Sequence, residues 1–140
     1  MILHSVSVGP RSGRSDAPVI VLTGSIGSTT DMWLPQMDAL SADARVIAVD
    51  HPGHGGSPVP TDDTTRYTVS DIATDLLTTL DALGVASFHL AGLSLGGAVA
   101  QYLAAGRVTR RPGVGLPTGW RWPVKRLTVP RRGVGSIRDR

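Results

Sequence analysis

A serine between two glycines, in the motif Gly-Leu-Ser-Leu-Gly at 92–96, is the feature that most constrains the fold of this chain. The motif follows an apolar run at 88–91 and leads into a small-residue segment at 97–103 that favours a helix. A serine on a tight turn from strand to helix has a strained backbone, so both flanking positions need glycine and the hydroxyl stands clear of the sheet. We therefore expect Ser94 to be a nucleophile. The N–H of Leu95 lies at the helix start, where unpaired amides and the helix dipole stabilise negative charge, so we expect it to form half of an oxyanion hole.

Short apolar runs predict the strands of the first 106 residues. Residues 19–22 and 46–49 are runs rich in β-branched side chains, as in strands buried on both faces. Residues 88–91 form the strand that leads to the serine motif. In a complete parallel sheet this strand is central, and we expect the sheet of this chain to end there with an exposed edge. Residues 3–8 alternate between apolar and polar side chains, which is typical of an exposed or edge strand.

Helical periodicity separates these runs. A first helix is expected around 33–40 and a second, clearer one at 70–83. Thr68 and Asp71 resemble a capping box, and Gly84 is a plausible terminator. Alternation of strands and helices predicts an α/β protein with a parallel sheet and helices on its faces. The apolar positions are Trp33, Met37 and Leu40 in the first helix and Val69, Ile72, Ala73, Leu76, Leu77, Leu80 and Leu83 in or beside the second.

Two glycine-rich loops follow the first two buried strands. Residues 23–27 read Thr-Gly-Ser-Ile-Gly, and residues 50–57 read Asp-His-Pro-Gly-His-Gly-Gly-Ser. Ligands of open α/β sheets bind at the carboxyl ends of the strands. We therefore expect these two loops and the motif at 92–96 to converge on one site.

In this order and at these spacings the three loops resemble the N-terminal half of an α/β-hydrolase. The segment 23–33, the motif continued to Gly97, and the run Gln-Tyr-Leu-Ala-Ala at 101–105 are more closely similar to the 3-oxoadipate enol-lactonases of aromatic-compound breakdown. The resemblance covers roughly residues 3 to 105. It implies a parallel-sheet α/β-hydrolase fold that is truncated after the helix following the serine motif.

The resemblance also implies a mechanism. Ser94 is the nucleophile that attacks a small lactone or ester, the amides of Leu95 and Ser25 form the oxyanion hole, and no metal or organic cofactor takes part. Thr23 stands where many α/β-hydrolases carry histidine, and Pro52 stands where arginine is common in the 50–57 loop. Similar motifs serve esterases, perhydrolases and acyltransferases, and these remain alternatives.

Other polar residues near the expected site have structural interpretations. His51 and His54 lie in a loop that supports the structure in the resembling family, and Asp50 is expected to accept hydrogen bonds there. His89 lies within a strand and is expected to be a satisfied strand histidine.

The charge of the chain changes sign near residue 106. Residues 1–106 contain four arginines against ten aspartates, whereas residues 107–140 contain ten basic side chains against Asp139 alone. We therefore divide the chain into the N-terminal half of a hydrolase domain, 1–106, and a basic tail, 107–140. Its density of arginine, glycine and proline resists core formation, so we expect the tail to be disordered or the product of a shifted reading frame or truncated gene.

The triad of the resembling family cannot be completed from these residues. Its order is serine, then an acid, then a histidine. No histidine follows His89, and the only acid after Ser94 is Asp139. We expect an incomplete and inactive fragment.

The basic tail allows a different hypothesis, a non-catalytic protein that binds nucleic acid or an anionic surface. Trp120 and Trp122 lie among its basic side chains, a composition found in such binders. Four prolines break every candidate element of the tail, and it contains no recognisable binding module. We therefore expect neither a nucleic acid nor a membrane partner.

The composition and the first residues of the chain indicate its cellular location. Its hydrophobic fraction is 41%, no apolar run reaches the length of a membrane span, and the first residues lack the pattern of a signal peptide. The absence of cysteine excludes disulfides, thiolate zinc sites and a cysteine nucleophile. We expect a cytoplasmic protein without a metal site.

Overall fold

A computed structural model describes residues 1–61 and 67–106 of the chain. The proposed basic tail, 107–140, lies outside the described residues.

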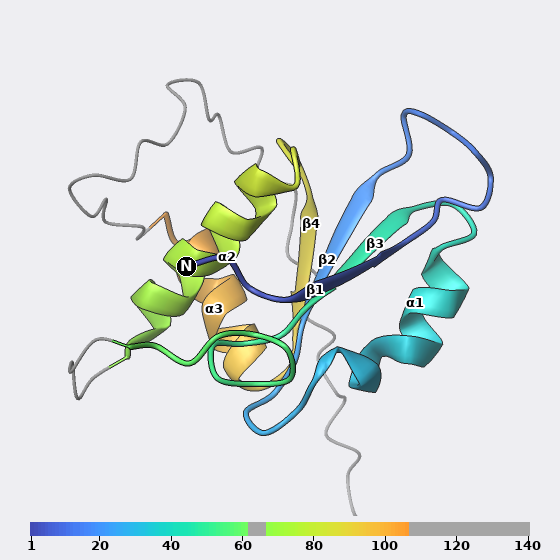
Figure 1. Ribbon diagram of the computed structural model, residues 1–140. Helices are drawn as coiled ribbons and strands as arrows, with labels where there is room; N and C mark the ends of the chain where they lie inside the picture. Colours follow the sequence, from blue (N-terminus) through green and yellow to red (C-terminus); the bar gives the residue numbers. More distant parts are fainter. Residues whose placement is uncertain (62–66, 107–140) are drawn as a thin grey trace, which may run out of the picture.

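The described residues form a four-stranded sheet of order β1-β3-β2-β4 (Figure 1). Its strands are β1 (Ser5–Val8), β2 (Val19–Thr23), β3 (Arg45–Val49) and β4 (His89–Gly92). β2 runs parallel to both β3 and β4, whereas β1 pairs with β3 in the antiparallel direction. The prediction of an edge strand at the N-terminus is confirmed, and the sheet is mostly rather than wholly parallel.

The helices cover both faces of this sheet (Figure 1). The 3-10 helix η1 (Thr30–Trp33) and α1 (Leu34–Leu40) lie on one side, and α2 (Val69–Ala82) and α3 (Leu95–Ala104) lie on the other. None of the helices in the described ranges is long and apolar enough to cross a membrane. This arrangement confirms the predicted α/β fold.

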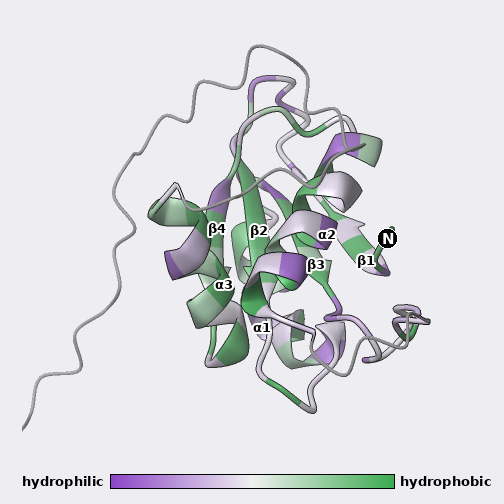
Figure 2. Ribbon diagram, turned by 90° about the vertical axis from the view of Figure 1, so that its left-hand side faces the viewer, coloured by the Kyte–Doolittle hydropathy of each residue, from purple (hydrophilic) through white to green (hydrophobic). Residues whose placement is uncertain are grey.

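Side chains of β3 alternate between the two faces, as the period of a strand requires. Ile47 and Val49 pack in the core formed with α2 and α3, and Val46 and Ala48 pack in the core formed with α1. All four are buried, which is why this run is apolar without interruption. Figure 2 shows the hydrophobic strands between helices that carry hydrophilic residues.

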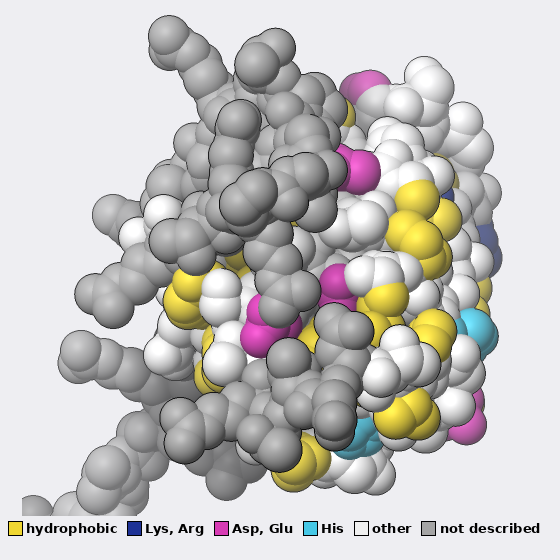
Figure 3. Space-filling model, turned by 60° about the vertical axis from the view of Figure 1, so that its left-hand side comes forward, with side chains coloured by type: hydrophobic (Ala, Val, Ile, Leu, Met, Phe, Trp, Pro, Cys, Tyr) yellow, Lys and Arg dark blue, Asp and Glu magenta, His cyan; other side chains and the backbone are white. Residues whose placement is uncertain are grey.

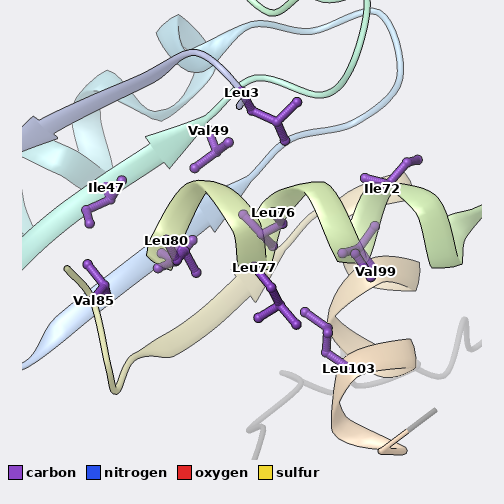
Figure 4. Packing of buried hydrophobic residues seen from close by; sticks show 12 residues of the cluster. Leu3, Ile47, Val49, Ile72, Leu76, Leu77, Leu80, Val85, Val99 and Leu103 are labelled. Atoms are coloured by element: carbon purple, nitrogen blue, oxygen red, sulfur yellow. The ribbon is translucent and has the colours of Figure 1, made fainter. Parts of the chain in front are cut away.

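The larger core fills the space between the sheet and the pair α2 and α3 (Figure 4). Leu76 and Leu80 of α2 are almost completely buried, and Val99 and Leu103 of α3 pack against the same cluster. These residues recur at three- and four-residue intervals, so one stripe of each helix faces the core.

The single helix expected at 33–40 is divided at Leu34. Thr29 caps η1 by accepting a hydrogen bond from the Asp31 N–H, and Pro35 stands in the first turn of α1. Proline has no N–H to donate, and it therefore favours the start of an α-helix over a continuation. Leu40 is exposed, so only part of the predicted apolar stripe is buried.

The termini of α2 follow the predicted signals. The Thr68 side chain accepts from the Asp71 N–H, and the Asp71 side chain accepts from the Thr68 N–H, which completes a capping box. Gly84 follows the helix with φ of +68°, a conformation that glycine adopts without strain.

Candidate active site

Ser94 lies at the turn between β4 and α3, as predicted. It is the N-cap of α3, with φ of 53° and ψ of −113°. Among the described residues it is the one non-glycine with positive φ. Such a backbone costs about 1–3 kcal/mol and persists only where its surroundings enforce it. Ser94 is exposed.

Two glycines allow this turn to press against its neighbours. A Cβ at Gly92 would lie 2.2 Å from the carbonyl carbon and oxygen of Gly96, and a Cβ at Gly96 would lie 2.2 Å from the carbonyl oxygen of Thr23. These obstacles are backbone atoms, which cannot move aside as a flexible side chain does. Both glycines of the motif are therefore required by packing.

The register of β2 and β4 brings the turn beside the loop that follows β2. Thr23 is paired with Gly92 in the parallel ladder, so Ser25 and Ser94 each lie two residues beyond the paired positions. The Leu93 N–H donates to the Thr23 carbonyl at 3.1 Å. The start of α3 is joined to the same loop at Gly24, whose carbonyl accepts from the Gly96 N–H at 3.0 Å. The structure thus brings the three predicted site residues to one edge of the sheet.

The loop after β2 is compact. Gly24 is closely surrounded, since an added Cβ would lie 2.5 Å from Ser28 Oγ and 2.7 Å from Met32 Sδ, and these side chains would have to move. The turn 25–28 closes on itself, because the carbonyl of Ser25 accepts from both the N–H and the hydroxyl of Ser28.

Asp50 organises the loop after β3. Its carboxylate is almost fully buried and accepts hydrogen bonds from the Thr30 N–H at 2.7 Å and the Gly56 N–H at 3.0 Å. It also pairs with His4 Nδ1 at 2.7 Å. Gly55 passes so close that a Cβ there would lie 2.1 Å from Asp50 Oδ2. These contacts join three segments of the chain, which agrees with the hydrogen-bonding role expected for Asp50.

Two histidines of the same loop contact the loop that carries Ser25. The Nε2 of His51 lies 2.8 Å from the Gly24 carbonyl, and the Nε2 of His54 accepts from the Gly27 N–H at 2.9 Å. Burial lowers the pKa of His51 below its ordinary value, against the opposing effects of the Gly24 hydrogen bond and the Asp50 charge. The sequence indicated a supporting loop but not these partners.

The two remaining histidines lie in different settings. His89 is exposed and pairs with Ile20 at the end of β4 away from the serine. The pairing of His4 with Asp50 was not predicted. The pair follows from the antiparallel register of β1 and β3. This register places Ser5 opposite Val49, so His4 and Asp50, the next residues along each chain segment, lie close together.

Acidic side chains outnumber basic ones in the part of the chain that the structure describes. No group of three or more histidine or aspartate side chains in the described ranges could hold a metal ion. On the side of α2, the described surface carries carboxylates and hydrophobic side chains, with basic side chains only at its far edge (Figure 3).

Comparison with known proteins gives consistent matches. The sequence matches the model of a family described as alpha/beta hydrolase fold over residues 17–110. It is 34% identical to 3-oxoadipate enol-lactonase 1 of Acinetobacter baylyi in an alignment covering 77% of this chain and 42% of that protein. It is 38% identical to the "Putative carbamate hydrolase RutD" of Pseudomonas savastanoi, covering 67% of this chain and 36% of that protein.

A crystal structure of the enol-lactonase from Burkholderia xenovorans is also similar, with 41% identity and a TM-score of 0.66. The match covers 74% of this chain and 38% of that structure. The chain therefore spans less than half the length of these relatives.

Proposed function

The chain belongs to the alpha/beta hydrolase fold family, and from this premise we propose that Ser94 is a nucleophile for acyl transfer from a small lactone or ester. The amides of Leu95 and Ser25 are the proposed oxyanion donors. The observation that carries the proposal is the strained, exposed Ser94 at the start of α3, two residues beyond a strand pairing that also positions Ser25.

The proposed chemistry follows from these positions. Ser94 Oγ attacks the carbonyl carbon, and the carbonyl oxygen becomes an oxyanion that two N–H groups stabilise. The bond to the leaving oxygen then breaks, and water later releases the acyl group. In the family resembled by the sequence, a histidine removes the serine proton.

The printed sequence supplies the nucleophile without that base. No histidine follows His89 in the 140 residues, and the only acid after Ser94 is Asp139. We propose that these residues provide the nucleophile and the oxyanion donors, while proton transfer requires a base that they do not contain.

Carbamate hydrolysis is a second candidate. It is favoured by the 38% identity to a protein named as a carbamate hydrolase. The same hydroxyl and amides suit a carbamate carbonyl, since attack generates an oxyanion at the same place. Comparing the imidazole-dependent acylation of Ser94 by a lactone, an ester and a carbamate of similar size distinguishes the two candidates.

The test supplies the missing base from solution. The chain is incubated with p-nitrophenyl acetate with and without imidazole, and acetylated positions are mapped by mass spectrometry. We expect imidazole to increase acetylation at Ser94 and to have no such effect on Ser12, an exposed serine in the loop before β2.

The matched controls are Ser94→Ala and Ser12→Ala. Ser94→Ala should remove the imidazole-dependent signal, whereas Ser12→Ala should retain it. Acetylation that is equal at the two serines, or that persists unchanged at the 94-containing peptide of Ser94→Ala, would contradict the proposal.

A further inference from the structure

One ring nitrogen of His54 faces a hydrogen-bond donor, and the other faces an acceptor. Nε2 accepts a hydrogen bond from the Gly27 N–H at 2.9 Å, and Nδ1 lies 2.9 Å from the carbonyl oxygen of Pro52. A backbone N–H only donates and a carbonyl only accepts. His54 must therefore be neutral in this arrangement, with its proton on Nδ1.

The hydrogen bond to Gly27 has a distinct structural role. Within the described ranges, the turn 25–28 is otherwise closed only by bonds from Ser28 to Ser25, inside the turn itself. His54 is thus the hydrogen-bond partner that joins the turn to the rest of the described fold. Gly27, at the tip of the turn, has φ of +76° and no side chain that could pack. Ile26 beside it is 72% exposed, so burial of its side chain does not hold the tip in place.

We propose that His54 is a positioning residue that, in its neutral form, fixes the tip of the turn 25–28 at Gly27, and that protonation of the ring releases this tip. A protonated imidazole carries N–H groups at both nitrogens and cannot accept from Gly27. The consequence for catalysis rests on the proposed function, because the tip belongs to the turn that begins at the proposed donor Ser25.

The ionisable groups around His54 set the electrostatic background. The His51 ring lies 6.0 Å from it, in a perpendicular orientation, and burial lowers the pKa of His51. Asp50 carries the negative charge of the same loop and is paired with His4. The loop 24–30 has no ionisable side chain, and Asp31 is the first one after it.

His51 provides an internal comparison. Its Nε2 faces a carbonyl, that of Gly24, so this nitrogen donates in the neutral and the protonated ring alike. Acidification therefore breaks the contact of His54 with the loop and leaves the contact of His51 intact. The Gly96 N–H, which donates to the same carbonyl, reports whether the fold itself persists.

The test follows backbone amides of the full 140-residue chain by two-dimensional ¹⁵N NMR and hydrogen exchange. The pH is lowered from about 8 to about 5, the range in which imidazoles titrate. We expect the Gly27 signal to shift and the exchange protection of Gly27 to fall about five- to tenfold, as expected for one hydrogen bond. Gly96 should keep its protection.

The variants are His54→Gln and His54→Ala. Glutamine offers a carbonyl oxygen that does not titrate, so Gly27 should stay protected across the pH range in His54→Gln. In His54→Ala its protection should be low at every pH. Loss of the pH response in His54→Gln cannot arise from a merely structural histidine, and the wild-type titration suffices if His54→Ala does not fold.

Two outcomes overturn the inference: a Gly27 signal that ignores pH in the wild type, or one that titrates equally in His54→Gln. These results are separate from acetylation of Ser94. If Gly27 responds as expected and Ser94 is not acetylated, the positioning of the turn stands and the proposed function fails. If Ser94 is acetylated and Gly27 does not respond, the proposed function stands and the positioning role of His54 fails.

Discussion

Adding one methyl group at Gly96 should destabilise the fold, whereas the same change at the next residue should not. A Cβ at Gly96 would lie 2.2 Å from the Thr23 carbonyl oxygen and 2.6 Å from Thr23 Oγ1. A Cβ at Gly97 finds its nearest neighbour, the Gly92 carbonyl oxygen, at 3.4 Å, which is ordinary contact. Gly96→Ala and Gly97→Ala are therefore a matched pair in the same turn of α3.

The magnitudes follow from these distances. Relief of the clash at Gly96 requires β2 and α3 to separate by about 1 Å, and overpacking of this kind costs about 1–3 kcal/mol. Because the obstacle is backbone, we expect the upper end of that range. Alanine gains at most about 1 kcal/mol over glycine in a helix, so Gly96→Ala should lose about 2 kcal/mol. Gly97→Ala should gain about 0.5 kcal/mol.

Urea unfolding followed by far-ultraviolet circular dichroism measures both effects. With a denaturant dependence of about 1–3 kcal/mol per molar urea, the midpoint of Gly96→Ala should fall by about 1 M. The midpoint of Gly97→Ala should stay level or rise. Equal midpoints for the two variants would refute the argument that the turn is pressed against β2.

Three further regions of the molecule give expected outcomes. Without added base, the 140-residue chain should hydrolyse p-nitrophenyl acetate no faster than Ser94→Ala, since loss of the triad base costs about a millionfold in turnover; a clear rate above that of Ser94→Ala would contradict this. Ser94→Gly should be about 1 kcal/mol more stable than Ser94→Ala in urea, because glycine adopts the positive φ without strain. Because the pKa of His51 is lower in the fold than in the unfolded chain, the unfolded chain takes up a proton at higher pH than the folded chain does. The contribution of His51 to the free energy of unfolding should therefore be fully present above the ordinary pKa of 6.5 and should decrease as the pH falls below it. His51→Gln should flatten that decrease in urea titrations across this range. Asp50→Ala, which removes an acceptor of three hydrogen bonds, should cost about 3 kcal/mol in the same assay, and Asp50→Asn, which keeps one acceptor oxygen, should cost less.

Elements with local signals were predictable from the sequence. The β-branched runs of β2 and β3 mark strands that are buried on both faces, and their bounds differ from the prediction by one residue. The capping box at Thr68 and the glycine at 84 likewise mark the ends of α2 through contacts within a few residues. Such signals need no knowledge of the remaining fold.

Features that depend on strand order could not be read in the same way. β1 is joined along the chain to β2 but pairs in the antiparallel direction with β3, and no local pattern encodes this choice of neighbour. The sheet was expected to end at the strand 88–91 because no apolar run suited to a further strand follows it, and in the described part β4 pairs with β2 alone and is partly exposed. Its short apolar run carries no information about how many neighbours it has.

The candidate site also has features that were predictable from the local sequence and features that were not. The glycines of the 92–96 motif predicted a strained turn, because only a close approach of backbones requires glycine at both positions. The partners of His51 and His54 were not predictable, since loops distant in sequence meet there only after β2 and β3 have paired. Sequence thus indicated which residues matter, and packing decided what they contact.

The strained backbone at Ser94 links the stability of the sheet to the proposed chemistry. A conformation that costs about 1–3 kcal/mol persists only if surrounding contacts leave no relaxed alternative. Those contacts are the hydrogen bonds that join Leu93 to Thr23 and Gly96 to Gly24, on the two sides of the serine. The residues that hold Ser94 in its turn are therefore the residues that position the loop bearing Ser25. Any change that loosens the end of β2 should relax the nucleophile and displace an oxyanion donor together, because one set of contacts positions both.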